Sequence, residues 1–249
     1  IEKSAALKRK IKSAMVYPLT IVSVAVVVVI FMLTFVIPVF AKMFSSLGAD
    51  LPIPTKIVVW LSDFVQGYIL LILVGLAGVV FGVRAYYRTE GGKSLIDALL
   101  LRLPVFGTLI RKVAVARFTR TLGTLVSSGV PILEGLRITA RTAGNKVVEK
   151  AVFATRASVT AGKTLADPLR TSGVFPPMVT QMIHVGEQTG ALDTMLAKIA
   201  DFYDDEVDTA VTALTALMEP LMIVFLGGVI GGMVVAMYLP IFKLVTLFK

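Results

Sequence analysis

Three long apolar runs alternate with polar segments along the chain and predict three membrane-spanning helices. Residues 13–41, 64–83 and 220–242 contain no Asp, Glu, Lys or Arg. Each run reaches the roughly 20 residues that a helix needs to cross a bilayer. The overall composition agrees, since 56% of the residues are hydrophobic and 16% are charged, whereas a soluble domain carries about 25% charged residues. The segment between the second and third runs is typical of a water-facing domain.

That water-facing segment is predicted to be helical throughout. Stretches within residues 113–210 end at glycines, and residues 192–203 place apolar side chains at the i, i+3, i+4, i+7 spacing of a helix face. A short stretch, 164–170, begins with a threonine suited to capping but is interrupted by Pro168. We therefore expect an all-α bundle of about six helices. Its last helix is expected to continue past Asp208 into the third span and to couple the bundle mechanically to the membrane.

Basic residues predict the orientation of the spans, because Lys and Arg concentrate on the cytoplasmic side of membrane proteins. They gather before the first span and after the second, so the chain start and residues 84–219 are expected to be cytoplasmic. This topology accounts for most of the net charge of +9. The basic stretch also lacks the interleaved aromatic residues of a stacking platform, so we expect no nucleic-acid partner.

The expected protein is all-α, a polytopic membrane protein with three transmembrane helices and a cytoplasmic helical bundle. Its expected segments are a cytoplasmic basic end of a preceding domain (1–13), transmembrane helix 1 (14–41), a short periplasmic loop (42–60), transmembrane helix 2 (61–83), a cytoplasmic basic connector (84–112), the bundle (113–210), transmembrane helix 3 (211–242) and a periplasmic tail (243–249).

The first and third spans resemble one another. Pro18 and Pro38 match Pro220 and Pro240 after a shift of 202 positions. The two spans also end with the similar tetrads IPVF and LPIF. Because the bundle precedes the third span, the repeat predicts a twin bundle ahead of the first span. This chain is then expected to be the later part of a longer protein.

Most catalytic and cofactor chemistry is excluded by residue types that the sequence lacks. It has no cysteine and a single histidine, His184, which removes thiolate nucleophiles and metal sites built on Cys or on His pairs. It has neither a GxxxxGKS/T phosphate loop nor a GxGxxG motif after a strand. We expect no catalytic residue, no metal site and no cofactor.

Three titratable features each have a functional and a structural interpretation. His184 could sense pH, but helix packing is favoured. An acidic run could bind a divalent cation or could pair with basic neighbours, which is favoured; it comprises Asp201, Asp204, Asp205, Glu206 and Asp208. Glu219 precedes Pro220 at the membrane edge, and a helix-positioning role is favoured there over a proton or ion relay.

Small residues in the spans indicate close helix packing. Overlapping GxxxG pairs occur in the third span and one pair occurs in the second; they involve Gly227, Gly228, Gly231, Gly232, Gly78 and Gly82. Docking of a partner's transmembrane helix and packing within this chain both remain open. A transporter or channel subunit is disfavoured because no charge lies inside the spans. A membrane enzyme would need converging titratable groups, for which only Glu219 and the acidic run qualify.

Several segments resemble one protein family. MVTQMIHVGEQTGALDTMLAKIADFYDDEV (178–207) is similar to the most characteristic segment of the inner-membrane platform proteins of type IV pilus and type II secretion systems. FTRTLGTLVSSGVPILEGL (118–136) and MEPLMIVFLG (218–227) look like the same family, and GADLPIPTKIVVWLSDF (48–64) looks closer to its pilus branch. The resemblance covers essentially the whole chain. In the family two homologous bundles alternate with three spans, which agrees with the repeat.

The resemblance implies a non-enzymatic assembly platform. Such a platform couples a cytoplasmic hexameric assembly ATPase to the insertion of pilin subunits into the growing fibre, with a type II secretion platform as the alternative. Gly186, Glu187, Gly190 and Leu192 match the family's G-E-x-x-G-x-L signature, and Glu219 with Pro220 its pre-span motif; both are expected to be structural. Implied partners are the ATPase, pilin transmembrane helices, other inner-membrane pilus subunits and further copies of the chain. Without the first bundle, this chain alone is not expected to assemble pili.

Charge clustering adds a hypothesis for the ATPase contact. The candidate basic face comprises Arg111, Lys112, Arg117, Arg120, Arg137 and Arg141. The glycine pairs of the third span are the candidate surface for pilin docking or helix packing.

Overall fold

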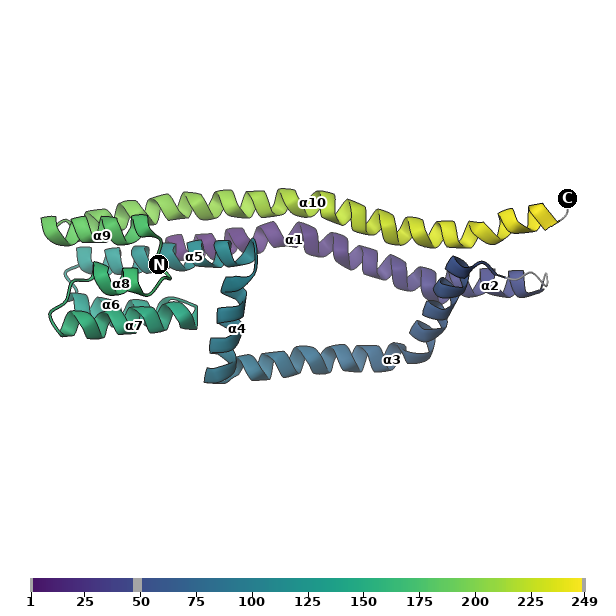
Figure 1. Cartoon of the computed structure of the whole chain (residues 1–249), viewed down its shortest axis with the longest axis horizontal. Helices are drawn as coiled ribbons and strands as arrows, with labels where there is room; N and C mark the ends of the chain where they lie inside the picture. Colours follow the sequence, from purple (N-terminus) through teal and green to yellow (C-terminus); the bar gives the residue numbers. More distant parts are fainter. Residues whose placement is uncertain (1, 47–50, 248–249) are drawn as a thin grey trace. The chain divides into compact units, whose positions relative to one another are not determined.

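A computed structural model describes residues 2–46 and 51–247, and every regular element in these ranges is helical (Figure 1). The elements are α1 (Glu2–Phe31), the π-helix η1 (Met32–Val36), α2 (Ile37–Ser46), α3 (Ile53–Arg88), α4 (Glu90–Arg102), α5 (Phe106–Ser127), α6 (Ile132–Thr142), α7 (Lys146–Thr160), α8 (Ala166–Thr171), α9 (Pro177–Thr189) and α10 (Leu192–Leu247). No strand occurs in the described ranges, which confirms the expected all-α class.

The chain divides into two compact units. The bundle unit comprises residues 1–12 and 84–214, and the span unit comprises residues 13–83 and 215–249. Three helical stretches are long and apolar enough to cross a membrane: Ser13–Phe44, Ile53–Arg88 and Leu192–Phe242. The prediction of three transmembrane helices is confirmed.

The bundle unit is built around one apolar core. Helices α5 to α9 pack together with the first turns of α10 (Figure 1). Phe118 on α5 is fully buried, and its ring lies 4.7 Å from that of Phe175 between centroids. Side chains from five helices close the core around this pair, namely Leu122, Leu136, Val152, Ile183 and Leu196. The sequence expectation of about six helices corresponds to α5 through α10.

The expected interruption at Pro168 was wrong. Helix α8 begins at Ala166, so Pro168 lies in its first turn. Backbone N–H groups in a first turn have no intrahelical acceptor, and proline therefore removes no helix bond there. Thr164 does not cap the backbone, since no side-chain cap bond forms at the start of α8. Its hydroxyl instead donates to Asp167 Oδ2 at 2.7 Å.

In the span unit, the π-helix η1 leaves one backbone carbonyl without a helical donor. The N–H of Ile37 donates to the carbonyl of Met32 instead of that of Leu33. The next residue along, Pro38, has no N–H to offer. The Leu33 carbonyl instead accepts from the hydroxyl of Ser62 on α3, and from Gln66 Nε2 at 3.3 Å. A polar side chain of one span thus completes the backbone bonding of another.

Helix α10 shows the same arrangement at the matching proline. Pro240 lies inside α10 and leaves the carbonyl of Ala236 without its i+4 donor. The hydroxyl of Thr55, also on α3, donates to that carbonyl. Thr55 and Ser62 are both buried, although the surrounding core is apolar and contains Leu33 and Met237. In the bilayer every backbone polar group needs a partner inside the protein, and α3 supplies two of these partners.

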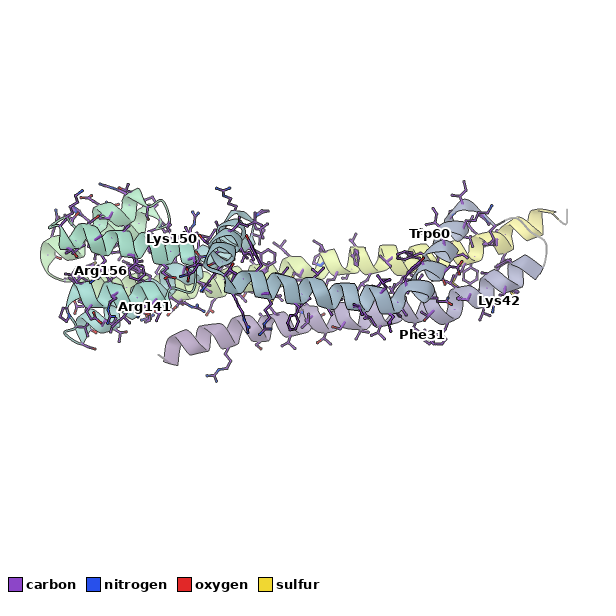
Figure 2. The ribbon with its side chains drawn as sticks, turned by 90° about the horizontal axis from the view of Figure 1, so that it is seen from below. Phe31, Lys42, Trp60, Arg141, Lys150 and Arg156 are labelled. Atoms are coloured by element: carbon purple, nitrogen blue, oxygen red, sulfur yellow. The ribbon has the colours of Figure 1, made fainter. Side chains whose placement is uncertain are left out.

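We expect the double substitution Thr55→Val, Ser62→Ala to destabilise the span unit by roughly 1–2 kcal/mol, because the Ala236 carbonyl loses its hydroxyl donor and the Leu33 carbonyl keeps only the longer bond from Gln66. Trp60 lies on α3 between the two hydroxyls and is the only tryptophan (Figure 2), so its emission during unfolding in mixed micelles reports the change. Thr20→Val is the matched control, since the Thr20 hydroxyl donates to Val16 O within its own helix. Equal stability of the double variant and the control would contradict the bonding role.

Candidate functional site

The signature segment lies where α9 meets the start of α10. Gly186 is buried on α9, and a Cβ atom at this position would lie 3.0 Å from Leu192 Cα and 3.1 Å from the side chain of Met195. Any side chain at position 186 would therefore push the two helices apart. The need for glycine here comes from close helix approach.

Glu187 connects α9 to the beginning of α8. Its two carboxylate oxygens accept from the backbone N–H of Leu165, at 2.8 and 3.0 Å. Leu165 directly precedes α8, and its side chain is buried in the bundle core. A negative charge at a helix start is also favoured by the helix dipole.

Gly190 and Leu192 complete the signature. Gly190 ends α9 in the left-handed conformation, with φ at 71°, which a residue with a side chain rarely adopts. Leu192 is the first residue of α10 and packs against the bundle core. The four signature residues thus lie at the junction of α8, α9 and α10. Glu187 is the only one of the four with a titratable side chain. Their structural role stays a prediction.

We expect Glu187→Ala to destabilise α8 by about 1–2 kcal/mol, since the Leu165 N–H loses a charged acceptor. Hydrogen exchange of α8 peptides in the reconstituted chain measures this as faster exchange. Gln188→Ala, at the exposed neighbouring position, should change stability by less than about 0.5 kcal/mol. Unchanged exchange in Glu187→Ala would show that the carboxylate does not hold α8.

The acidic run of α10 pairs with α5. Arg120 Nη2 lies 2.6 Å from both Asp201 Oδ1 and Asp204 Oδ2, and Lys112 Nζ lies 2.6 Å from Glu206 Oε2. Partial burial acts to lower the pKa of Arg120, but the hydrogen bonds to the two aspartates outweigh it and raise the pKa above its ordinary value. Within the part of the chain that the structure describes, no group of three or more Asp, Glu or His side chains could hold a metal ion.

The six candidate basic residues have different surroundings. Lys112 and Arg120 are engaged by α10, and Arg137 donates to Glu134 on its own helix, with Nε 2.8 Å from Oε2. This hydrogen bond from Arg137 lowers the pKa of Glu134. Arg117 is half-buried and Arg111 is exposed. Arg141 is also exposed (Figure 2). Three of the six cations therefore form ion pairs within the bundle unit. The exposed basic face contains fewer unpaired cations than the sequence predicted.

His184 and Glu219 have different surroundings. His184 is half-buried on α9 and lines a shallow open hollow with Asp167, Arg170 and Thr180. Glu219 and Pro220 are exposed on α10. Among the described residues, no hydrogen bond or ion pair forms at the Glu219 carboxylate. The helix-positioning role of Glu219 remains a prediction.

The glycine pairs of the spans face open space. Apart from the neighbouring backbone of the same helix, no described atom lies within 4 Å of a Cβ placed on any of them; they are Gly78, Gly82, Gly227, Gly228, Gly231 and Gly232. Docking of a partner's transmembrane helix and packing within the chain both stay predictions for these glycines.

Sequence reasoning missed Asp97, the most buried charged side chain of the bundle unit in the described residues, at 2% exposure. Its carboxylate accepts from Tyr87 Oη at 3.0 Å and from the backbone N–H of Lys146 at 2.7 Å. It thereby joins the last turn of α3, helix α4 and the start of α7. The preceding asparagine, Asn145, caps α7 by accepting from Val147 N–H at 2.9 Å.

Several known proteins are similar to this chain in sequence. Residues 118–240 match the family model described as type II secretion system (T2SS), protein F. Over 243 residues the chain is 53% identical to the type IV pilus assembly protein PilC of Myxococcus xanthus, covering 98% of this chain and 58% of that protein. It is 49% identical to PilC of Thermus thermophilus (98% and 61%) and 34% identical to type II secretion system protein F of Pseudomonas aeruginosa (95% and 58%).

The helical bundle, the three spans and these similarities define the class: the chain belongs to the family of type IV pilus PilC proteins and type II secretion protein F. Within that family the pilus branch is favoured, since the identity to PilC proteins is higher than to protein F. The chain spans about three fifths of the length of the relatives named above.

Proposed function

We propose that this chain is part of an inner-membrane assembly platform of a type IV pilus machine, coupling a cytoplasmic assembly ATPase to the insertion of pilin subunits into the fibre. One observation carries the proposal. Helix α10 is continuous from Leu192 to Leu247, so a single element contributes core residues to the bundle unit and an apolar stretch to the span unit. A part that transmits work needs such a connection and no reactive groups of its own.

The orientation follows from the charges that flank the spans. We propose that the bundle unit is cytoplasmic, because Lys and Arg gather in the segments before the first span and after the second. An ATPase would then meet the bundle unit, and pilin helices would meet the spans within the bilayer. Other inner-membrane pilus subunits and further copies of the chain are the remaining proposed partners.

The proposed ATPase contact is centred on exposed cations of the bundle unit. Arg141 and Arg111 are the best candidates of the six, because neither is paired with an acid among the described residues. Lys112, Arg120 and Arg137 would have to leave carboxylate partners to bind a second protein, which is unfavourable. The surface around Arg141 on α6 is therefore the first to test.

The proposed pilin contact is the glycine face of α10. Gly228 and Gly232 are four residues apart, and no described atom lies near their Cβ positions. Small residues at this spacing let a second helix approach closely in lipid. A pilin transmembrane helix has the apolar surface that such a face accommodates.

Photo-crosslinking in living bacteria tests both contacts in the full-length parent protein. One probe replaces Arg141 and another replaces Gly228, with Val185 on α9 as an exposed control position. Adducts of the first probe to a hexameric ATPase and of the second to pilin would support the proposal. Adducts of both probes only to other copies of the chain would overturn the coupling role. Adducts to secretion pseudopilins would favour the type II secretion alternative, which the 34% identity to protein F keeps open.

A further inference from the structure

The exposed side of α4 is apolar, whereas its inner side carries a carboxylate. Leu95 and Leu99 are each 59% exposed and lie one turn apart. Further exposed apolar side chains follow in the turn after α4, at Leu103 and Val105, and at the first residue of α5, Phe106. Asp97, in contrast, is buried. A helix of a water-facing bundle normally shows the opposite distribution.

Polar contacts on the inner side hold α4 in this orientation. Asp97 accepts from Tyr87 and from the N–H of Lys146. Lys150 on α7 donates to Ser94 at 2.8 Å and lies beside α4 (Figure 2). Lys146 Nζ lies 3.2 Å from Glu90 Oε2 at the beginning of α4. Rotation of α4 to hide its leucines would break these contacts, so the apolar face is a stable feature of the bundle unit.

Cations border the apolar face. Arg88, Arg102 and Lys150 are all exposed, and the last two line an open hollow with Leu95 and Leu99. The one exposed acid of α4, Glu90, is paired with Lys146. Apolar side chains flanked by cations match the interface of an anionic bilayer, where acyl chains lie beneath negatively charged headgroups.

The position of α4 in the chain places it at headgroup depth. Residues 84–89 alone separate α4 from the charge-free run that ends at Val83. The five helical residues among them, 84–88, span about 7.5 Å, which is close to the thickness of the headgroup region on one side of a bilayer. The chain also turns at Thr89, between the last turn of α3 and α4 (Figure 1).

We propose that the outer face of α4 and the following turn form a membrane-interface surface that inserts Leu95, Leu99 and Phe106 among the acyl chains of anionic phospholipids. Arg88, Arg102 and Lys150 bind the phosphate headgroups around them. The bundle unit is thereby attached to the bilayer surface by a lipid contact in addition to its covalent connections. This surface is independent of the proposed ATPase and pilin contacts.

Spin labelling tests the proposal in the full chain, because the sequence has no cysteine and one introduced cysteine is a unique label site. Leu99→Cys carries the label on the proposed surface. Val185→Cys is the control, since it is similarly exposed on α9. Residue 185 is also a suitable control because α9 packs next to the start of α10. That start lies about 30 Å along the helix from residue 211, where the third span is expected to begin. Both variants are reconstituted in bilayers of phosphatidylcholine with or without phosphatidylglycerol.

Collision rates of the label with oxygen and with a water-soluble nickel complex separate the possible environments of residue 99. With phosphatidylglycerol present we expect several-fold more oxygen contact than nickel contact at residue 99, and the reverse at residue 185. Nickel contact at residue 99 equal to that at residue 185 would overturn the proposal, as would low contact with both reagents, which indicates a protein neighbour. In the triple variant Arg88→Gln, Arg102→Gln, Lys150→Gln, the ratio of oxygen contact to nickel contact at residue 99 should fall. If this ratio were unchanged both in the triple variant and in bilayers of pure phosphatidylcholine, the role of anionic headgroups would be overturned.

Discussion

Replacing Phe118 by alanine is expected to lower the free energy of unfolding of the bundle unit by about 3–5 kcal/mol. The ring is fully buried on α5 and packs at 4.7 Å between centroids against Phe175. Its removal leaves a cavity at the centre of the bundle core, and it also removes an aromatic pair. Hydrogen exchange of α5 to α9 peptides in the reconstituted chain measures the loss as faster exchange across all five helices.

The control for this substitution is Phe202→Ala. Phe202 lies on α10 in the same unit but is 47% exposed, so its removal creates no enclosed cavity. We expect a loss of less than about 1 kcal/mol there. Similar losses for the two variants would mean that Phe118 is not at the centre of a packed core.

Replacing Asp97 by alanine is expected to cost the bundle unit about 2–4 kcal/mol. Two donors, Tyr87 Oη and the N–H of Lys146, then lose a charged acceptor in a buried position. The damage should be local to α4 and the first turn of α7. Exchange of peptides from these two segments is the measurement.

Tyr87→Phe provides the matched comparison, because it removes one donor and leaves the carboxylate bonded to Lys146. We expect it to cost about 1 kcal/mol. If Asp97→Ala were no more damaging than Tyr87→Phe, the connection between α4 and α7 would not depend on the carboxylate.

The spans and the bundle class could be predicted from local sequence, because both depend on patterns within a few turns of helix. Uncharged runs of about 20 residues are sufficient to indicate a spanning helix. Glycines at the ends of periodic stretches were also informative, as Gly190 at the end of α9 shows. Pro168 misled because the effect of proline depends on where the helix starts, and that start was placed two residues too early.

The polar contacts could not be predicted, because their partners are far apart in the sequence. Arg120 pairs with Asp201 and Asp204, more than 80 positions away, so counting cations alone overestimated the exposed basic face. Asp97 gave no signal, since one aspartate in a leucine-rich helix is typical of an exposed position. Its burial depends on Tyr87 and α7, which only the tertiary structure brings together.

The two proline-freed carbonyls have a consequence for how the spans can change over evolution. The acceptors belong to the repeated segments, near Pro38 and Pro240, whereas both donors belong to α3, which lies outside the repeat. Thr55 and Ser62 are seven residues apart, which puts them on one side of that helix. A residue with an N–H in place of Pro38 or Pro240 would satisfy the carbonyl within its own helix, and the hydroxyl of α3 would then lose that carbonyl as its acceptor. We therefore expect each proline and its hydroxyl to be exchanged together among relatives, while the apolar residues around them drift independently.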